Sequence, residues 1–163
     1  MPTLKPEYRE QLSNEFDRQV ENLVQKGYPK IASVKAEPDK VALEELITLY
    51  CDAWGEPDPA RRRHMLQRVW AENGTYTDPT VHLTGSNELV EYIGKVLKKY
   101  PGARIVQTSV VDTHHRMVRF TWRMVSADGQ TLTEGIDFGE LSSEGKLRRI
   151  VGFFGQLAAR QAA

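Results

Sequence analysis

The side chain best placed by the sequence to do chemistry is Asp78, at the end of the segment Thr75-Tyr76-Thr77, which follows a turn expected at Asn73-Gly74. Thr75-Tyr76-Thr77 has the β-branched and aromatic residues of a strand, and Pro79 favours extended backbone at Asp78 and ends that strand. A carboxylate fixed at the end of a short strand can act as a general acid or base. It can equally cap a turn. The sequence leaves both interpretations open.

A second carboxylate, Asp137, lies between Ile136 and Phe138 in a segment with strand character, so its side chain points away from theirs. If Asp137 faces a pocket, Ile136 and Phe138 face outward and need a cover, which a second subunit would provide. If the two apolar residues face the helices instead, Asp137 lies on the outside. Thr133 and Gly135 share the face of Asp137 and leave room there, which favours the pocket.

Tyr50 lies on one face of an expected helix with Leu46, Ile47 and Trp54, so its ring should be buried. A buried phenol needs a hydrogen-bond partner. Tyr50 is therefore a candidate for the core, for a pocket wall or for a catalytic role. The neighbouring Cys51 has no base near it in the sequence, and we interpret it as inert.

The remaining candidates are aromatic residues and histidines. Six aromatic side chains are expected in the core, and a subset of them would line an apolar pocket: Trp54, Trp70, Phe120, Trp122, Phe153 and Phe154. By strand alternation His114 shares the face of Phe120 and Trp122, where it would be either a base near neutral pH or a structural histidine. The histidines lack metal-ligand spacing, and no phosphate-binding glycine loop, serine-hydrolase motif or zinc motif is present. We expect neither a metal nor another cofactor.

Composition narrows the class of protein. Of 163 residues, 40% are apolar and 27% are charged, and the 22 Lys and Arg residues balance the 22 Asp and Glu residues. This is typical of a globular protein and offers no basic excess for nucleic acid or for an anionic membrane. A single cysteine, the lack of an apolar run of membrane-spanning length and the lack of an apolar leader predict a cytoplasmic protein.

The elements that would position these side chains come in two groups. Helical spacing of apolar residues predicts a helix near residues 6–26, then helices beginning near Asp39, Asp58 and Ser86. Arg61 to Arg63 are expected to form a solvated face. Alternation from residue 104 to residue 154 predicts an antiparallel meander, so the fold class is α+β with helices on one sheet face. We divide the chain into an N-terminal helical extension, residues 1–38, and a main domain, residues 39–163.

From about Val41 to Gly155 the chain resembles the nuclear transport factor 2-like superfamily, and within it SnoaL-like polyketide cyclases and ketosteroid isomerases. The resemblance rests on the motifs Tyr50-Cys-Asp-Ala-Trp54, Trp70-Ala-Glu-Asn-Gly-Thr-Tyr-Thr-Asp78-Pro79, Glu134-Gly-Ile-Asp137-Phe138, Gly145-Lys-Leu and Gly152-Phe-Phe-Gly155. It implies a cone, in which N-terminal helices cover a curved, mostly antiparallel sheet and a hydrophobic pocket lies between the two layers.

The resemblance also implies roles for residues. In ketosteroid isomerases the general base matches Asp78, while a tyrosine matching Tyr50 and a protonated carboxylic acid matching Asp137 hold the oxyanion. The expected activity is a cofactor-free isomerase or cyclase reaction on a small apolar carbonyl substrate. The alternatives are epoxide hydrolysis or dehydration on the same fold, and a non-catalytic module for small-ligand binding or dimerisation. A homodimer formed through the sheet is expected as well.

Overall fold

The computed structural model of the protein describes residues 14, 15, 18, 19, 22, 25, 39–158 and 160. The chain separates into two compact units, Met1–Ala36 and Glu37–Ala163. Most of the helix expected near residues 6–26, including its apolar positions, lies outside the described residues. The second unit contains all the helices and strands of the main domain.

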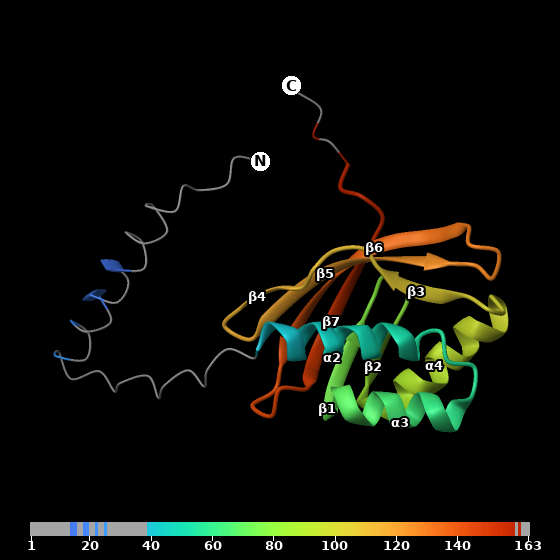
Figure 1. Cartoon of the computed structure of the whole chain (residues 1–163), viewed down its shortest axis with the longest axis horizontal. Coiled ribbons are helices and arrows are strands. Elements are labelled where there is room, and N and C mark those ends of the chain that lie inside the picture. Colours follow the sequence, from blue (N-terminus) through green and yellow to red (C-terminus); the bar gives the residue numbers. More distant parts are fainter. Residues whose placement is uncertain are drawn as a thin grey trace. The chain divides into compact units, whose positions relative to one another are not determined.

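Three helices and seven strands build the main domain (Figure 1). The helices are α2 (Lys40–Ala53), α3 (Pro59–Val69) and α4 (Gly85–Lys99). The strands are β1 (Trp70–Thr77), β2 (His82–Thr84), β3 (Arg104–Gln107), β4 (Asp112–His114), β5 (Met117–Val125), β6 (Thr131–Leu141) and β7 (Leu147–Phe154). Helices come first and the longest strands last, as the sequence pattern predicted.

The strands form one sheet in the order β2-β1-β7-β6-β5-β3, and β4 pairs with β5 on the same edge as β3. Neighbouring strands are antiparallel except β1 and β7, which run parallel. The meander β5-β6-β7 follows from alternation and from the hairpin turns between its strands. The parallel pair joins strands that are far apart in the sequence, so local patterns could not reveal it.

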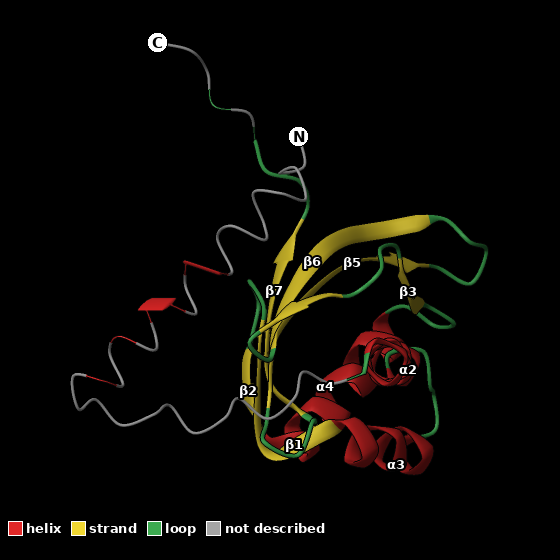
Figure 2. Ribbon diagram, turned by 60° about the vertical axis from the view of Figure 1, so that its left-hand side comes forward, coloured by secondary structure: helices red, strands yellow, loops and turns green. Residues whose placement is uncertain are grey.

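The helices lie on the concave side of the sheet, which bends around them (Figure 2). Side chains from both layers meet in one core, whose largest fully buried members are Ile47, Leu66, Leu89, Val90, Ile93, Phe120, Leu147 and Ile150. Because successive strand residues point to opposite faces, Val118, Phe120 and Trp122 of β5 all face this core, in agreement with the sequence pattern. The architecture is a three-helix layer on a curved, unclosed mixed sheet.

Local signals explain where α3 begins and ends. Asp58 is its N-cap and accepts a hydrogen bond from the Arg61 amide at 2.7 Å, with Pro59 at the first helical position. At its other end the backbone becomes extended at Trp70, which starts β1 without a loop. The turn expected at Asn73-Gly74 is therefore wrong. That dipeptide lies within β1, where the register with β7 shifts in the manner of a bulge.

Arg62 contradicts the expected solvated arginine face. Its side chain is only 4% exposed, and its guanidinium donates hydrogen bonds to the backbone carbonyls of Val90 at 3.0 Å and Glu56 at 2.6 Å. Gly94 makes room for it, since a Cβ there would stand 2.8 Å from a guanidinium nitrogen. Arg62 thus ties α3 to α4 and to the loop before α3. Residue spacing could not reveal this role, because the acceptors are backbone carbonyls.

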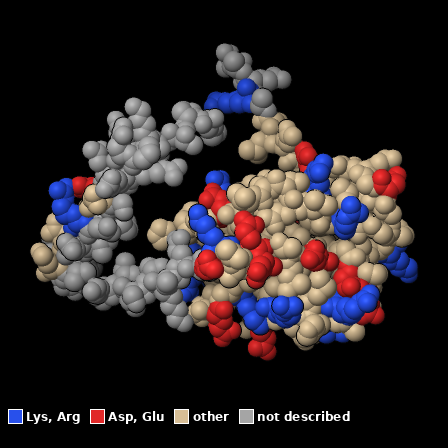
Figure 3. Space-filling model, in the orientation of Figure 1, with Lys and Arg blue, Asp and Glu red and all other residues tan. Residues whose placement is uncertain are grey.

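Basic and acidic side chains are interspersed over the face drawn in Figure 3, in keeping with the zero net charge. They do not gather on this face into the single-sign patch that would attract an anionic partner. Of the helices in the described part of the chain, none combines the length and the apolar character needed to cross a lipid bilayer.

Candidate functional site

A pocket of about 470 Å³ lies between the helical layer and the concave face of the sheet. Its wall is mostly aromatic and aliphatic, with side chains from α2, α4, β1, β3, β5, β6 and β7. A cavity of this size and character is typical of small-molecule sites. Most of the side chains proposed from the sequence line it: Tyr50, Trp54, Asp78, Phe120, Trp122, Asp137 and Phe154.

Asp137 enters the pocket from the middle of β6 and is only 4% exposed. Ile136 and Phe138 consequently point to the opposite side of the sheet. Burial raises the pKa of the Asp137 carboxyl to about 7, because the charged form loses its water; a 2.8 Å hydrogen bond from Trp122 Nε1 to Oδ1 lowers that pKa, and the charge of Asp78 raises it. Near neutral pH the carboxyl therefore exists both with and without its proton.

Asp78 stands just after β1, is 8% exposed, and has hydrogen-bond donors at both carboxylate oxygens. Oδ1 accepts from the Thr80 amide at 2.7 Å, the Thr80 hydroxyl at 2.7 Å and the Val81 amide at 3.0 Å. Oδ2 accepts from the hydroxyls of Tyr76 at 3.0 Å and Tyr92 at 3.4 Å. Asp78 thus caps the turn after β1, which is one of the two interpretations that the sequence left open, and it also lines the pocket.

Tyr76 and Tyr92 are pocket residues that sequence reasoning missed. Burial raises the pKa of the Tyr76 phenol far above its usual value, and the charges of Asp137 and Asp78 raise it further, so the phenol keeps its proton. The Tyr92 hydroxyl lies 2.9 Å from the Thr80 hydroxyl. A signal for Tyr76 existed, since residues 76 and 78 share a face of an extended strand. Tyr92 reaches Asp78 from another element, which no local pattern could indicate.

Tyr50 is 2% exposed, and its ring stacks on Trp70 with 5.9 Å between centroids and meets Phe120 edge-on at 6.3 Å. Burial holds the pKa of its phenol well above 10.0, and the charge of Asp137 adds to the effect. Within the described part of the chain its hydroxyl has no partner in hydrogen-bond geometry. It is still close enough to Asp137 to lower the pKa of that carboxyl, against the larger effect of burial. Tyr50 is therefore a protonated donor that lacks an acceptor of good geometry.

The two carboxyl groups approach each other across Gly152 of β7. Gly152 pairs with Asp137 between strands, and a Cβ at Gly152 would stand 2.9 Å from Asp137 Oδ1 and 3.8 Å from Asp78 Cβ. Any side chain here would intrude between the acids. Glycine at this position lets β1, β6 and β7 bring both acids into one site.

Three of the residues expected in the core or the pocket wall lie outside that wall: Trp70, His114 and Phe153, whose side chain is 56% exposed on the outer face of the sheet. Trp70 is 2% exposed in the core behind the pocket and is not part of its wall. His114 is exposed at the end of β4, outside the pocket. The alternation that placed His114 beside Phe120 fails because His115 and Arg116 have positive φ values of 48° and 62°, which reverse the chain between β4 and β5.

The site has the groups needed for proton transfer. A carboxyl that titrates near neutrality, a carboxylate fixed by several donors and a phenol that lacks a partner of good geometry among the described residues face one apolar cavity. Such groups can take a proton from carbon and stabilise the oxyanion that forms. No group of three or more His, Cys, Asp and Glu side chains among the described residues is arranged to hold a metal ion.

The sequence model of the SnoaL-like domain matches residues 47–150, from the middle of α2 into β7. The chain belongs to the SnoaL-like family. Its three helices on a curved, unclosed mixed sheet form the cone of nuclear transport factor 2-like proteins. No curated protein matches this SnoaL-like sequence.

Several solved structures are similar to this SnoaL-like chain. A candidate isomerase of the SnoaL-like family from Agrobacterium tumefaciens is 36% identical, covers 69% of this chain and 96% of its own, and has a TM-score of 0.65. A candidate SnoaL-like polyketide cyclase from Jannaschia is 14% identical. The match covers 74% of this chain and 90% of the cyclase, with a TM-score of 0.58. A protein of ketosteroid isomerase-like fold from Catenulispora acidiphila, in complex with trimethylamine, is 14% identical, with 66% and 83% covered and a TM-score of 0.54. The last two likenesses show the fold alone.

Proposed function

We propose that this SnoaL-like protein is a cofactor-free enzyme of the isomerase or cyclase type that moves a proton on a small, largely apolar carbonyl substrate. The observation that carries the proposal is Asp137, a buried carboxyl with a pKa near 7 that faces an apolar pocket beside a second acid. Such a group can accept a proton and return it at neutral pH. Membership of the family and the likeness to a candidate isomerase support the same class of reaction.

Asp137 is better placed than Asp78 to move the proton. Asp78 accepts hydrogen bonds at both of its oxygens, so taking a proton from carbon would disrupt at least one of them. Asp137 accepts one bond of good geometry, from Trp122 at Oδ1, and the nearby Tyr50 hydroxyl also lowers its pKa, so fewer donors hold it than hold Asp78. In our proposal Asp137 is the base and Asp78 is a fixed anion that helps to raise its pKa. This exchanges the roles that the family resemblance implied for the two acids.

The proposed reaction starts when ionised Asp137 takes a proton from the carbon next to the substrate carbonyl. The electron pair of the broken C–H bond forms an enolate, and the Tyr50 hydroxyl donates a hydrogen bond to the enolate oxygen. In an isomerisation the protonated Asp137 returns the proton to a different carbon. In a cyclisation the enolate carbon attacks a second carbonyl, and the new alkoxide receives the proton instead. Both routes restore the carboxylate.

The test is turnover of a panel of β,γ-unsaturated cyclic ketones of increasing size, followed by the ultraviolet absorbance of the conjugated product. Asp137→Asn should lower kcat about a hundredfold or more, because it removes the group that carries the proton. Asp78→Asn should lower kcat less, and it should shift the pH profile of kcat/KM to lower pH because the fixed anion is gone. Asp112→Asn, at an exposed carboxyl that pairs with Arg119 outside the pocket, is the matched control and should leave turnover unchanged.

Three outcomes would contradict this assignment. Full activity of Asp137→Asn together with loss of activity in Asp78→Asn would make Asp78 the base. Equal activity of both variants and the native protein would place catalysis elsewhere. Binding of the ketones without any turnover across the panel would favour the non-catalytic ligand-binding module instead.

We further propose that a second copy of the chain covers the outer face of the sheet. Phe138 and Phe153 are 39% and 56% exposed there, with ring centroids 6.2 Å apart. The outer positions around them include the acid Glu140 and the bases Arg119 and Arg149. An apolar centre with charges of both signs around it is self-complementary, which is what a twofold interface requires.

A further inference from the structure

The mouth of the pocket carries two positive charges that the proposed proton transfer does not use. Lys95 and Lys99 both line the pocket, and they lie one turn apart on the same face of α4. Both side chains are exposed. No described carboxylate stands within 4.0 Å of either ammonium group, so both are available to a ligand.

The surroundings of Lys99 place its charge beside the tyrosines of the pocket. Its Nζ lies 5.1 Å from the centre of the Tyr100 ring. Burial raises the pKa of the Tyr92 phenol, and the nearby charge of Lys99 lowers it. Tyr92 in turn contacts Asp78 and Thr80, so the wall from the lysines to the acids is continuous.

Stabilisation of the helix does not account for both lysines. Cations in the last turn of a helix interact favourably with its dipole, and Lys98 and Lys99 occupy that turn of α4. Lys95 lies before the last turn. Glu91, one turn earlier, forms no ion pair with Lys95. Lys95 therefore adds a positive charge at the pocket for which the helix itself gives no reason.

We infer that the substrate is an amphiphilic acid, in which an apolar body carries the reacting carbonyl at one end and an anionic group of the carboxylate type at the other. The anionic group binds Lys95 and Lys99 at the mouth, and the carbonyl end reaches Asp137. The fixed charge of Asp78 repels a second anion from the inner end of the pocket, so the substrate enters in one orientation. The orientation of the carbonyl rests on the proposed function, whereas binding of the anionic group does not.

Two fluorescent probes with the same rings separate the anionic contribution from the apolar one. Anilinonaphthalene sulfonate carries a negative charge, and N-phenylnaphthylamine lacks it. We expect the native protein to bind the sulfonate more tightly, and added sodium chloride to weaken the sulfonate alone. The double variant Lys95→Gln/Lys99→Gln should weaken sulfonate binding about three- to tenfold, the scale of two exposed ion pairs, and leave the neutral probe within about twofold.

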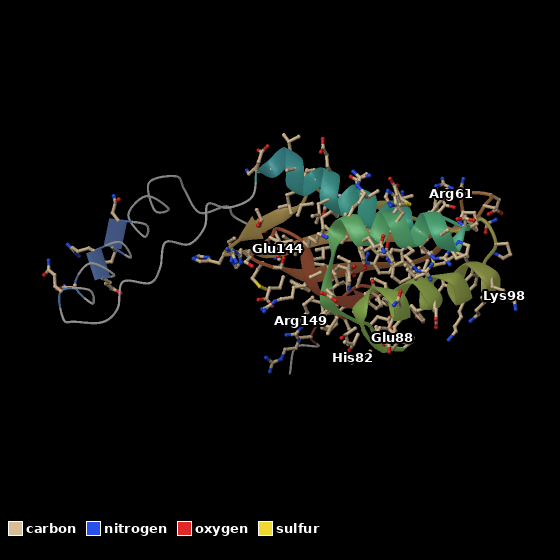
Figure 4. All side chains as sticks on the ribbon, turned by 90° about the horizontal axis from the view of Figure 1, so that it is seen from below. Arg61, His82, Glu88, Lys98, Glu144 and Arg149 are labelled. Atoms are coloured by element: carbon tan, nitrogen blue, oxygen red, sulfur yellow. The ribbon has the colours of Figure 1, made fainter. Side chains whose placement is uncertain are left out.

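Lys98→Gln is the matched control, because Lys98 lies at the same end of α4 (Figure 4). Lys98 is not one of the residues that line the pocket. It should leave both probes unchanged. The charge-reversal variant Lys95→Glu/Lys99→Glu should weaken the sulfonate further and spare the neutral probe, which excludes a general loss of folding. The inference is overturned if the double variants leave the ratio of the two affinities unchanged, or if Lys98→Gln changes it equally.

The result is independent of turnover. Asp137→Asn should keep the preference for the sulfonate even where it abolishes catalysis. Loss of turnover with the preference intact therefore concerns the proposed base, and loss of the preference with turnover intact concerns the lysines.

Discussion

At Asp137, neighbouring groups act on one carboxyl in opposite directions. Withdrawal from water and the charge of Asp78 favour the protonated form, and the indole of Trp122 favours the ionised one. The net effect is a carboxyl that titrates near pH 7 instead of its ordinary value of 3.8. Because the folded-state pKa is raised, the favourable contribution of this carboxyl to stability is complete below the ordinary value and is lost as pH rises through the folded-state value.

We therefore expect the free energy of unfolding of Asp137→Asn to rise relative to that of the native protein as pH rises from about 4 to about 8. At about 1.4 kcal/mol per pH unit, the relative gain should be on the order of 4 kcal/mol over the full range. Urea unfolding of both proteins across this range measures the difference. Asp112→Asn, at a fully exposed carboxyl, should show no such rise. If the difference in unfolding free energy between Asp137→Asn and the native protein is also independent of pH, the Asp137 carboxyl is hydrated and its pKa is not raised.

The sequence was sufficient to place Asp137 and Tyr50, and insufficient to define their partners. Alternation along β6, with small residues on one face, correctly put Asp137 toward the pocket, and helical spacing correctly buried Tyr50. The hydroxyl of Tyr92 on Asp78 and the indole of Trp122 on Asp137 come from other elements. Such contacts depend on how elements pack, which residue spacing does not encode.

Among the elements, β1, β6 and β7 together make the acid pair, and the central strand contributes by having no side chain at Gly152. An added methyl group would stand 2.9 Å from Asp137 Oδ1. The backbone of β7 cannot easily move away, because β1 and β6 pair with it on either side. By contrast, at Gly139 of β6 an added methyl would meet Val118 at 2.7 Å and Ile150 at 2.8 Å, away from the acids. Alanine at Gly152 would therefore disturb the acids of the site, whereas alanine at Gly139 would disturb only the packing of the core.

We expect Gly152→Ala to lower kcat by about tenfold or more and to move the pH profile, because it displaces the Asp137 carboxyl. Gly139→Ala should cost stability, by roughly 1–3 kcal/mol of overpacking, and preserve the pH profile. Turnover of the ketone panel and urea unfolding of the two variants measure the two effects. Identical profiles for both variants would show that Gly152 serves packing alone.

Element order and type were predictable from the sequence, and element pairing only in part. The helices of the main domain and the antiparallel strands follow from periodicity and turn residues, and Asp58 caps α3 as expected. The other two expected caps are wrong, because Asp39 makes no side-chain cap bond and α4 begins at Gly85, before Ser86.

The predictions failed where the backbone departs from regular geometry. Asn73-Gly74 lies in a bulge within β1 and not in a turn between elements. The positive φ values of His115 and Arg116 break the strand alternation that had placed His114 on the pocket face. Alternation holds only along an uninterrupted strand.

At the scale of the whole molecule, the inward side chain of Asp137 forces neighbouring apolar residues to the outer face. Phe138 and Phe153 lie on long, paired strands at the middle of the sheet, where solvent exposure is costly. The same alternation that builds the pocket therefore creates the surface that we propose for the dimer.

We expect the native protein to sediment as a dimer and Phe153→Arg to shift it to a monomer, because a charge would be buried at the centre of the interface. Val110→Arg is the control, since Val110 is 78% exposed in the loop between β3 and β4. It should leave the dimer intact. A native protein that is monomeric at all concentrations would refute the proposed covering of the outer face.

The position of β7 between β6 and β1 has a consequence for biosynthesis. The hairpin β1-β2 and the strands β3 to β6 share no pairing with each other, so only β7 joins them into one sheet. Until β7 has been made, the β1-β2 hairpin and the strands β3 to β6 have no strand to join them. Gly152 lies in this last strand, so the two acids can come together only after β7 has been made and has left the ribosomal exit tunnel. Ligand binding and completion of the sheet should therefore appear together, late in synthesis.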